Sequence, residues 1–163
     1  MMSEMFDGAV VVSPSPGFGH ADAVLALAGV LRAAAPPGLR VLSAPFPVRL
    51  GRQTELRPDL LVARYVDLVR DELTAPPVLA VEVGSPASDM VDRSLKRVVY
   101  ARHGVPSYWL VDPETPALTA LELDAGGDYR AVADVVGVER FLAVRPFPVR
   151  ICPLELVAGL RPC

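Results

Sequence analysis

The order of apolar and polar residues predicts a chain in which many short strands are combined with two helices. Near the beginning, two apolar runs flank Asp7-Gly8, a dipeptide typical of the tight turn of a β-hairpin. Apolar side chains then recur at helical spacing over residues 20–35, and Pro36-Pro37-Gly38 ends this helix. The expected core stripe of the helix consists of Val24, Leu27, Ala28 and Leu31.

The middle of the chain is dominated by predicted strands. Residues 40–50 and residues 56–64 each have the pattern of one strand, and residues 66–73 that of a short helical turn. Residues 78–83 are apolar on both faces apart from Glu82, which predicts a central strand buried on both sides.

A second helix and further strands complete the predicted fold. The helix is expected over residues 89–103, with a core stripe of Val91, Leu95, Val98 and Val99. Further strand is predicted over residues 107–111, 118–123, 129–136 and 141–156. About two helices against seven or eight strands indicate an α/β or α+β fold, a mixed β-sheet flanked by helices. The length of 163 residues suits one domain over residues 1–163.

Composition narrows the location and the chemistry of the protein. The chain is 52% hydrophobic, but its longest apolar run, residues 23–31, is about half of the roughly 20 residues that cross a bilayer. An acid, Glu4, stands where a secretory signal would carry basic residues. We therefore expect a cytoplasmic protein without membrane insertion. The lack of CxxC pairs and of Cys/His clusters argues against a zinc site.

Glu82 occupies the most costly position in the sequence. A carboxylate in a strand that is buried on both faces must find a partner or stay protonated, because an unpaired buried charge costs several kcal/mol. The compensation could come from a metal ion, from a basic side chain, or from exposure at the strand end. The simplest alternative to a functional role is a structural salt bridge with Arg93, Lys96 or Arg97.

Asp59 is the second acid of interest, directly after Pro58 at the start of an apolar run. Taken alone, it is most simply a water-exposed residue at the beginning of a strand. If its strand neighbours the strand of Glu82, however, the two carboxylates converge at one edge, and a divalent cation relieves their repulsion. Oxygen ligands without Cys or His favour Mg²⁺, with Mn²⁺ as a substitute.

Lys96 lies on the helix that follows Glu82. Its position four residues after Asp92 permits an ordinary surface ion pair, worth about 0.3–0.5 kcal/mol. A helix packed back on its own strand could instead bring the ammonium group to the two carboxylates, where it would polarise water or stabilise charge on a phosphorus atom. The arginines of this helix are either a solvated face or a local phosphate-binding patch, namely Arg93, Arg97 and Arg102.

Several motifs together resemble a known family. They are Arg57-Pro58-Asp59-Leu60-Leu61-Val62, Val81-Glu82-Val83-Gly84-Ser85-Pro86, Asp92-x-x-x-Lys96 and Gly104-Val105-Pro106-x-Tyr108-Trp109-Leu110-Val111-Asp112-Pro113. In this order and spacing they are similar to the Uma-type restriction endonuclease family of prokaryotes, placed in the PD-(D/E)XK nuclease-like superfamily. The resemblance covers most of the chain and implies a restriction-endonuclease-like mixed sheet with a magnesium-dependent phosphodiesterase site.

The resemblance also implies roles for individual residues. Asp59 matches the first metal-binding acid and Glu82 the acid of the (D/E)XK motif, and the backbone carbonyl of Val83 would be a further metal ligand. The lysine usually found two residues after the acid is replaced by Gly84, and the family's lysine on the following helix matches Lys96.

Two residues of the N-terminal part match as well. Glu4 matches an acid near the site, and His20 matches a histidine after the proline-rich loop. The implied catalytic set is therefore Asp59, Glu82, Lys96 and Glu4, and the implied metal ligands are Asp59, Glu82 and Val83.

Three hypotheses for function follow. The leading one is Mg²⁺-dependent hydrolysis of DNA phosphodiester bonds. A formal net charge of −3 is unusual for a protein that holds nucleic acid by charge, and it favours a second hypothesis, a weak or inactive nuclease-fold module that binds nucleic acid or protein. The third is a structural protein in which Glu82 and Lys96 are merely paired. Nuclease folds of this kind often pair across a two-fold axis, which makes a homodimer one of the assemblies to consider.

Overall fold

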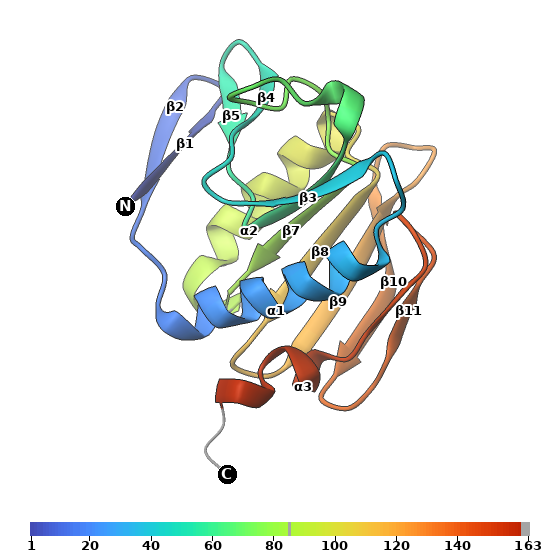
Figure 1. Ribbon diagram of the computed structural model, residues 1–163. Helices are drawn as coiled ribbons and strands as arrows, with labels where there is room; N and C mark the ends of the chain where they lie inside the picture. Colours follow the sequence, from blue (N-terminus) through green and yellow to red (C-terminus); the bar gives the residue numbers. More distant parts are fainter. Residues whose placement is uncertain (85, 161–163) are drawn as a thin grey trace.

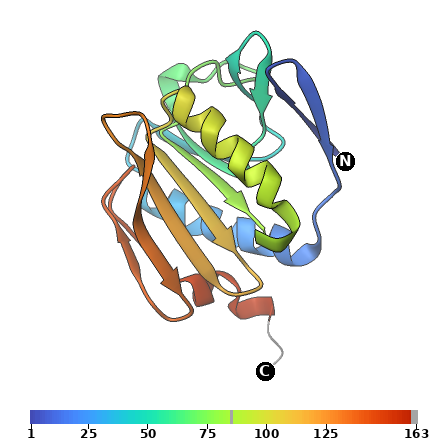
Figure 2. The same ribbon diagram turned by 180° about the vertical axis from the view of Figure 1, so that it is seen from behind.

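The computed structural model describes residues 1–84 and 86–160, without the side chains of residues 86–92 and of residue 160. Its largest sheet has six strands, β3 (Leu39–Ser43), β6 (Leu60–Arg64), β7 (Leu79–Val83), β8 (Ser107–Asp112), β9 (Ala117–Leu123) and β10 (Tyr129–Val136). Their order is β10-β9-β8-β7-β6-β3; β7 and β8 run parallel, and the other neighbours pair antiparallel. Helix α1 (Phe18–Ala34) crosses one face (Figure 1), and α2 (Pro86–Arg102) covers the opposite face (Figure 2).

Two smaller sheets and a short helix make up most of the rest of the described chain. The first sheet consists of β1 (Met2–Phe6), β2 (Ala9–Ser13), β4 (Val48–Gly51) and β5 (Thr54–Leu56), in the order β2-β1-β5-β4. The second pairs β11 (Phe141–Ala143) with β12 (Val149–Ile151), after which α3 (Pro153–Leu156) follows. The remaining elements are two 3₁₀ turns, Tyr65–Asp67 and Ala158–Leu160. These elements confirm the expected mixed α+β fold with helices on both faces of the main sheet.

The predicted N-terminal hairpin is confirmed. Asp7 and Gly8 both have positive φ angles, 49° and 89°, which is the backbone of the two-residue turn that Asp-Gly favours. The turn sets the register of β1 against β2, with Glu4 opposite Val11. Because side chains alternate along a strand, Glu4 and Phe6 share the face of β1 that is buried.

The main core lies between α1 and the six-stranded sheet. Helix α1 begins two residues before the expected start, and it buries Ala23, Leu27 and Leu31 against one face of the sheet. In β7 that face carries Leu79, Val81 and Val83. The other face of the same strand therefore carries Ala80 and Glu82, which point toward α2.

The expected core stripe of α2 is confirmed for Val99 and wrong for Leu95 and Val98. Leu95 and Val98 are exposed, and the side chain of Val91 is outside the described part of the chain. Among the described side chains, the buried face of α2 carries Lys96, Val99 and Tyr100 instead. Lys96 and Tyr100 are polar because this face of the helix lies over Glu82. Their burial is stabilised by contacts with the Glu82 carboxyl group rather than by apolar packing alone.

Two segments expected to be single strands are each divided between sheets. Residues 40–50 form β3 in the large sheet and β4 in the small one, and residues 56–64 likewise form the end of β5 and then β6. Prolines lie at both divisions, at positions 45, 47 and 58, and a proline has no N–H to continue a ladder of hydrogen bonds. The second division places Asp59 directly before β6.

The C-terminal segment also differs from the expectation of strand over residues 141–156. Pro153 stands at the start of a short helix, a position where its missing N–H costs nothing. Of the predicted helical turn at residues 66–73, the structure contains the 3₁₀ turn Tyr65–Asp67. The described residues hold twelve strands rather than seven or eight, since several strands are only three residues long. None of their helices is long and apolar enough to span a bilayer.

The packing of α1 can be tested with two leucines of the same helix. Leu27 is fully buried in the main core, whereas Leu25 is 71% exposed. Leu27→Ala should lower the free energy of unfolding by about 2–5 kcal/mol, and Leu25→Ala should change it by less than about 0.5 kcal/mol. Urea unfolding followed by circular dichroism measures both, and equal effects would contradict the assignment of the buried face.

Candidate active site

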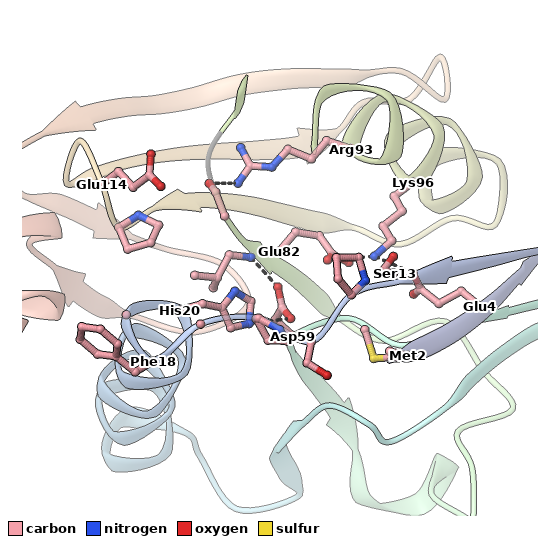
Figure 3. A pocket seen from close by; sticks show the side chains of 18 residues that line it. Met2, Glu4, Ser13, Phe18, His20, Asp59, Glu82, Arg93, Lys96 and Glu114 are labelled. Carbon is pink, nitrogen blue, oxygen red and sulfur yellow. Dashed lines mark hydrogen bonds and ion pairs between the residues drawn. The ribbon is translucent and has the colours of Figure 1, made fainter. Parts of the chain in front are cut away.

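An open pocket of about 600 Å³ lies beside the end of β7, between β1 and the two long helices (Figure 3). Four of its lining residues are charged and nearly buried, with no more than 9% of each residue exposed: Glu4, Asp59, Glu82 and Lys96. The exposed part of the lining comes mainly from the segment that joins β2 to the first turn of α1. The charged groups therefore form the floor of the pocket and this segment forms much of its rim.

Glu82 reaches the floor from β7, the strand that is buried on both faces. Its Oε2 atom lies 3.1 Å from the Lys96 Nζ atom. Its Oε1 atom accepts a hydrogen bond from the Tyr100 hydroxyl group, also at 3.1 Å. Both donors come from α2 because residues 96 and 100 are one helical turn apart on the same face.

The electrostatics of Glu82 are dominated by its burial. Removal from water raises the pKa of Glu82 to about 8. The Lys96 ammonium group lowers this pKa, and the carboxylates of Asp59 and Glu4 raise it. Burial, followed by the charge of Glu82, raises the pKa of Tyr100 well above its ordinary value, so the hydroxyl group keeps its proton and acts as a donor.

Lys96 joins Glu82 to a second acid, Glu4. The Lys96 Nζ atom lies 2.9 Å from Glu4 Oε2, and all three residues are buried. One ammonium group thus compensates two carboxyl groups from different sheets. This arrangement joins β1, β7 and α2, because removing Lys96 leaves two buried carboxyl groups without their shared cation.

Glu4 is held from its other side by the end of β5. Its Oε1 atom accepts a hydrogen bond from the backbone N–H of Arg57 at 2.6 Å. The Arg57 guanidinium group bonds the carbonyl oxygen of Ser3 and pairs with Glu55 at 2.7 Å. The small sheet therefore positions Glu4 through both backbone and side-chain contacts.

Asp59 approaches the same pocket from the start of β6. Because β6 and β7 are antiparallel, with Leu60 opposite Val81, the residue before β6 lies beside the end of β7. Asp59 Oδ2 accepts a hydrogen bond from the Val83 N–H at 2.7 Å, and Asp59 Oδ1 lies 3.1 Å from His20 Nε2. These two contacts orient the carboxylate group.

Arg93 holds the turn that follows β7. Its Nη2 atom donates to the carbonyl oxygens of Gly84 and of Val111, the latter at 3.3 Å. The Gly84 N–H in turn donates to the Val111 carbonyl oxygen at 2.8 Å. Arg93 also lines the pocket, so its guanidinium group lies beside the backbone of Val83 and Gly84.

The structure brings together the acids and the lysine that the sequence singled out. Asp59 is buried, so the interpretation of this residue as a water-exposed strand start is wrong. Of the three basic partners considered for Glu82, the structure pairs it with Lys96. The Asp92 side chain of the alternative Asp92–Lys96 pair is outside the described part of the chain. The metal-binding role of the Val83 carbonyl stays a prediction, although Val83 does line the pocket.

The three arginines considered on α2 make separate contacts. Arg97 donates to the carbonyl oxygen of Tyr129 at 3.0 Å, and Arg102 pairs with Asp7 at 2.9 Å. Arg93 lines the pocket, whereas the other two lie elsewhere. Arg97 and Arg102 are exposed, as the alternative of a solvated face expects, and a phosphate-binding role of these arginines stays a prediction.

Tyr100 is the residue that the analysis of the sequence missed. The sequence pattern gave it no role, yet its hydroxyl group donates to Glu82. Its position four residues after Lys96 is the signal that could have identified it, because side chains at this spacing share one face of a helix.

The donor atoms around the pocket suit a hard divalent cation. The acids supply carboxylate oxygens, and the described lining contains no cysteine. Within the described residues, no three His, Cys, Asp or Glu side chains form a ready metal-binding cluster. A cation here would therefore rely on fewer than three such side chains, with backbone, water or substrate oxygens completing its shell, which is how Mg²⁺ is commonly held.

Comparison with known proteins identifies the family of the chain. The model of a family described as "Uma2: Putative restriction endonuclease" matches residues 1–155, nearly the whole chain. The chain belongs to the Uma2 family. No curated protein is detectably similar to it in sequence.

Two solved structures are similar to this Uma2 protein to different degrees. A putative nuclease of the DUF820 group from Anabaena variabilis has a TM-score of 0.76 at 17% identity, and the match covers 98% of this chain and 91% of that one. The type IIG restriction endonuclease BpuSI has a TM-score of 0.48 at 15% identity, with 93% of this chain and 18% of that chain covered. The first similarity shows the shared fold, and the second is too weak to add to it.

The raised pKa of Glu82 predicts how stability depends on pH in metal-free buffer. The pKa of Glu82 is about 8 in the folded state and 4.5 for an ordinary glutamate. Between pH 4.5 and pH 8 the folded state therefore keeps a proton on Glu82 that the unfolded state has lost. This contribution to stability is fully present below pH 4.5 and is lost as the pH rises through about 8. The free energy of unfolding should thus fall as the pH rises over this interval. The ionisable groups that neighbour Glu82 are Lys96, Tyr100, Asp59 and Glu4.

The variant Glu82→Gln isolates this effect because its amide group does not titrate. Urea unfolding at about pH 5, 7 and 9 should show a steeper decline for the wild type than for Glu82→Gln, by more than about 1 kcal/mol in total. Glu122→Gln on β9 is the matched control and should follow the wild type. Parallel curves for the wild type and Glu82→Gln would show that Glu82 titrates normally.

Proposed function

We propose that the protein is a metal-dependent endonuclease that hydrolyses DNA phosphodiester bonds in the pocket of Glu4, Asp59, Glu82 and Lys96. The observation that carries this proposal is the convergence of two carboxylates from adjacent strands with a buried ammonium group at one open pocket. Membership of a nuclease family supports the same reaction class.

A divalent cation fits the proposed reaction. Restriction-endonuclease-like proteins generally use divalent metals. Asp59, Glu82 and the backbone carbonyl of Val83 would hold Mg²⁺, with Mn²⁺ as a substitute. When bound, the cation would supply Lewis-acid chemistry, lowering the pKa of a water molecule and withdrawing charge from the phosphate.

The side chains of this chain have distinct tasks in the proposal. Lys96 donates hydrogen bonds to the phosphate oxygens as negative charge develops on them, because a preformed donor in a nearly buried site needs little reorganisation. Glu4 holds the Lys96 Nζ atom at 2.9 Å and so fixes its direction. His20 and the Val83 N–H hold the two oxygens of Asp59.

Metal binding is the first test. Mg²⁺ or Mn²⁺ at about 100 times its dissociation constant should stabilise the folded protein by about 2.7 kcal/mol, a rise of several degrees in Tm. Glu82→Gln and Asp59→Asn should each remove most of this rise, because each deletes a charged ligand. Differential scanning fluorimetry with and without the cation measures it.

The control for this test is Glu122→Gln, an acid of β9 outside the pocket, which should keep the full rise in Tm. An equal rise in all variants would indicate binding elsewhere on the surface. No rise in the wild type would favour the alternative of a nuclease fold without metal-dependent catalysis.

Lys96 is expected to affect the reaction rather than metal binding. Lys96→Gln should reduce the rate of DNA cleavage by about 100-fold or more, since it removes a charged donor to the phosphate, while the metal-induced rise in Tm remains. Glu4→Gln keeps Lys96 and should reduce the rate less. Gel assays of labelled DNA report the rates, and a Lys96→Gln variant with the wild-type rate would exclude Lys96 from the reaction.

A further inference from the structure

The depth of the pocket restricts what can reach its charged floor. Glu82 is 6% exposed and Lys96 is 2% exposed, so a phosphate group must enter the pocket to meet them. The exposed segment around Ser15 and Phe18 stands at the edge of this pocket. Duplex DNA is stiff over about 150 base pairs, whereas a single strand bends at every nucleotide. Access to the floor therefore favours a flexible strand.

The charges around the pocket also favour a single strand over a duplex. Among the described lining residues, the Lys and Arg side chains are Arg93 and Lys96, and Lys96 is already paired with two acids. The exposed lining carries an acid, Glu114. Proteins that hold duplex DNA place Lys and Arg along the phosphates of both strands. This pocket offers such contacts to one strand at most.

Phe18 supplies the feature that a single strand requires. It is the first residue of α1, it lines the pocket, and it is 82% exposed. Figure 3 shows it on the far side of His20 from Asp59. An aromatic ring so exposed adds little to the core, but it offers a face on which an unpaired base can stack.

Arg93 offers a contact for the backbone of the same strand. Its described hydrogen bonds to the carbonyl oxygens of Gly84 and Val111 both use Nη2. A guanidinium group has five N–H donors, so the rest of its fork is suited to a phosphate oxygen.

We infer that the pocket accepts a single DNA strand rather than an intact duplex, with one base stacked on Phe18 and a phosphate beside Arg93. This inference rests on the proposed function, because it names the form of DNA that the same site would cleave. The second strand of a duplex does not enter the pocket in this arrangement. A duplex therefore becomes a substrate only where its ends fray or where it carries an unpaired end.

The first experiment compares substrates with the wild-type protein and Mn²⁺. A single-stranded oligonucleotide, the blunt duplex of the same sequence, and that duplex with a single-stranded tail are cleaved in parallel. The single strand and the tail should be cut at least about tenfold faster than the blunt duplex. Equal rates on all three would overturn the inference while leaving the proposed hydrolysis intact.

The second experiment tests Phe18 itself. Phe18→Ala should raise KM for the single strand by about fivefold or more, the range found for losing one stacked base, and leave kcat nearly unchanged. Phe18→Trp should keep the wild-type KM, because it retains an aromatic face. Leu25→Ala, an exposed apolar residue of the same helix outside the pocket, is the matched control.

A binding measurement separates failure of this inference from failure of the proposed reaction. Fluorescence anisotropy of a labelled single strand is recorded without metal, so it does not depend on cleavage. Weaker binding by Phe18→Ala than by Leu25→Ala supports the stacking role even if the protein cleaves nothing. Equal affinity of these two variants overturns it, whatever the cleavage assays show.

Discussion

The structure depends on one buried ammonium group. Lys96 lies between Glu4 and Glu82, and the three side chains come from α2, β1 and β7. Each charge loses its water on burial, and this loss is offset only if the partners stay within hydrogen-bonding distance. The small sheet, the central strand and the second helix are therefore held in one relative arrangement by electrostatics as well as by packing.

This constraint explains the unusual burial on α2. Strand β7, α2 and β8 form a parallel crossover, in which the helix packs back on the strand that precedes it. The helix face that meets the sheet combines apolar contacts near Tyr108 with polar contacts at Glu82. Val98 remains in water on the opposite side. A helix that serves a polar site cannot also follow an ordinary apolar stripe.

The sequence predicted which charged residues come together better than it predicted the strands around them. Glu82 stood out because its neighbours in the strand are apolar, and that signal is local. Chain order allowed Asp59 and Lys96 to converge with Glu82 if their elements were neighbours, since a strand, a turn and a helix in succession can return to the same edge. The roles of these residues were implied by the family resemblance and stay predictions. Glu4 is different, because it meets Lys96 only after the hairpin has docked on α2, 92 residues further along the chain. Nothing in the composition of the first ten residues fixes that docking, and only the family resemblance pointed to it.

The pattern of apolar and polar residues could not predict the divided strands, for a related reason. Residues on both sides of Pro45 and Pro58 have the alternation of strands, so the pattern itself continues through each division. What changes is the sheet to which each part belongs, and this depends on long-range pairing that alternation does not record. The same division releases Asp59 from the ladder and lets its carboxylate meet the Val83 N–H.

The charge balance of the pocket connects the site to the form of its substrate. Its described lining contains four acids, Glu4, Asp59, Glu82 and Glu114, against Lys96, Arg93 and the titratable His20. Since Lys96 is engaged by two of these acids, the described lining offers a polyanion few further positive charges. If few phosphate contacts are available, the affinity for DNA must come from contacts that do not involve charge. Binding through such contacts depends only weakly on salt concentration. An exposed aromatic ring at the rim is such a contact, which is why the acidic character of the floor and the exposure of Phe18 support the same interpretation.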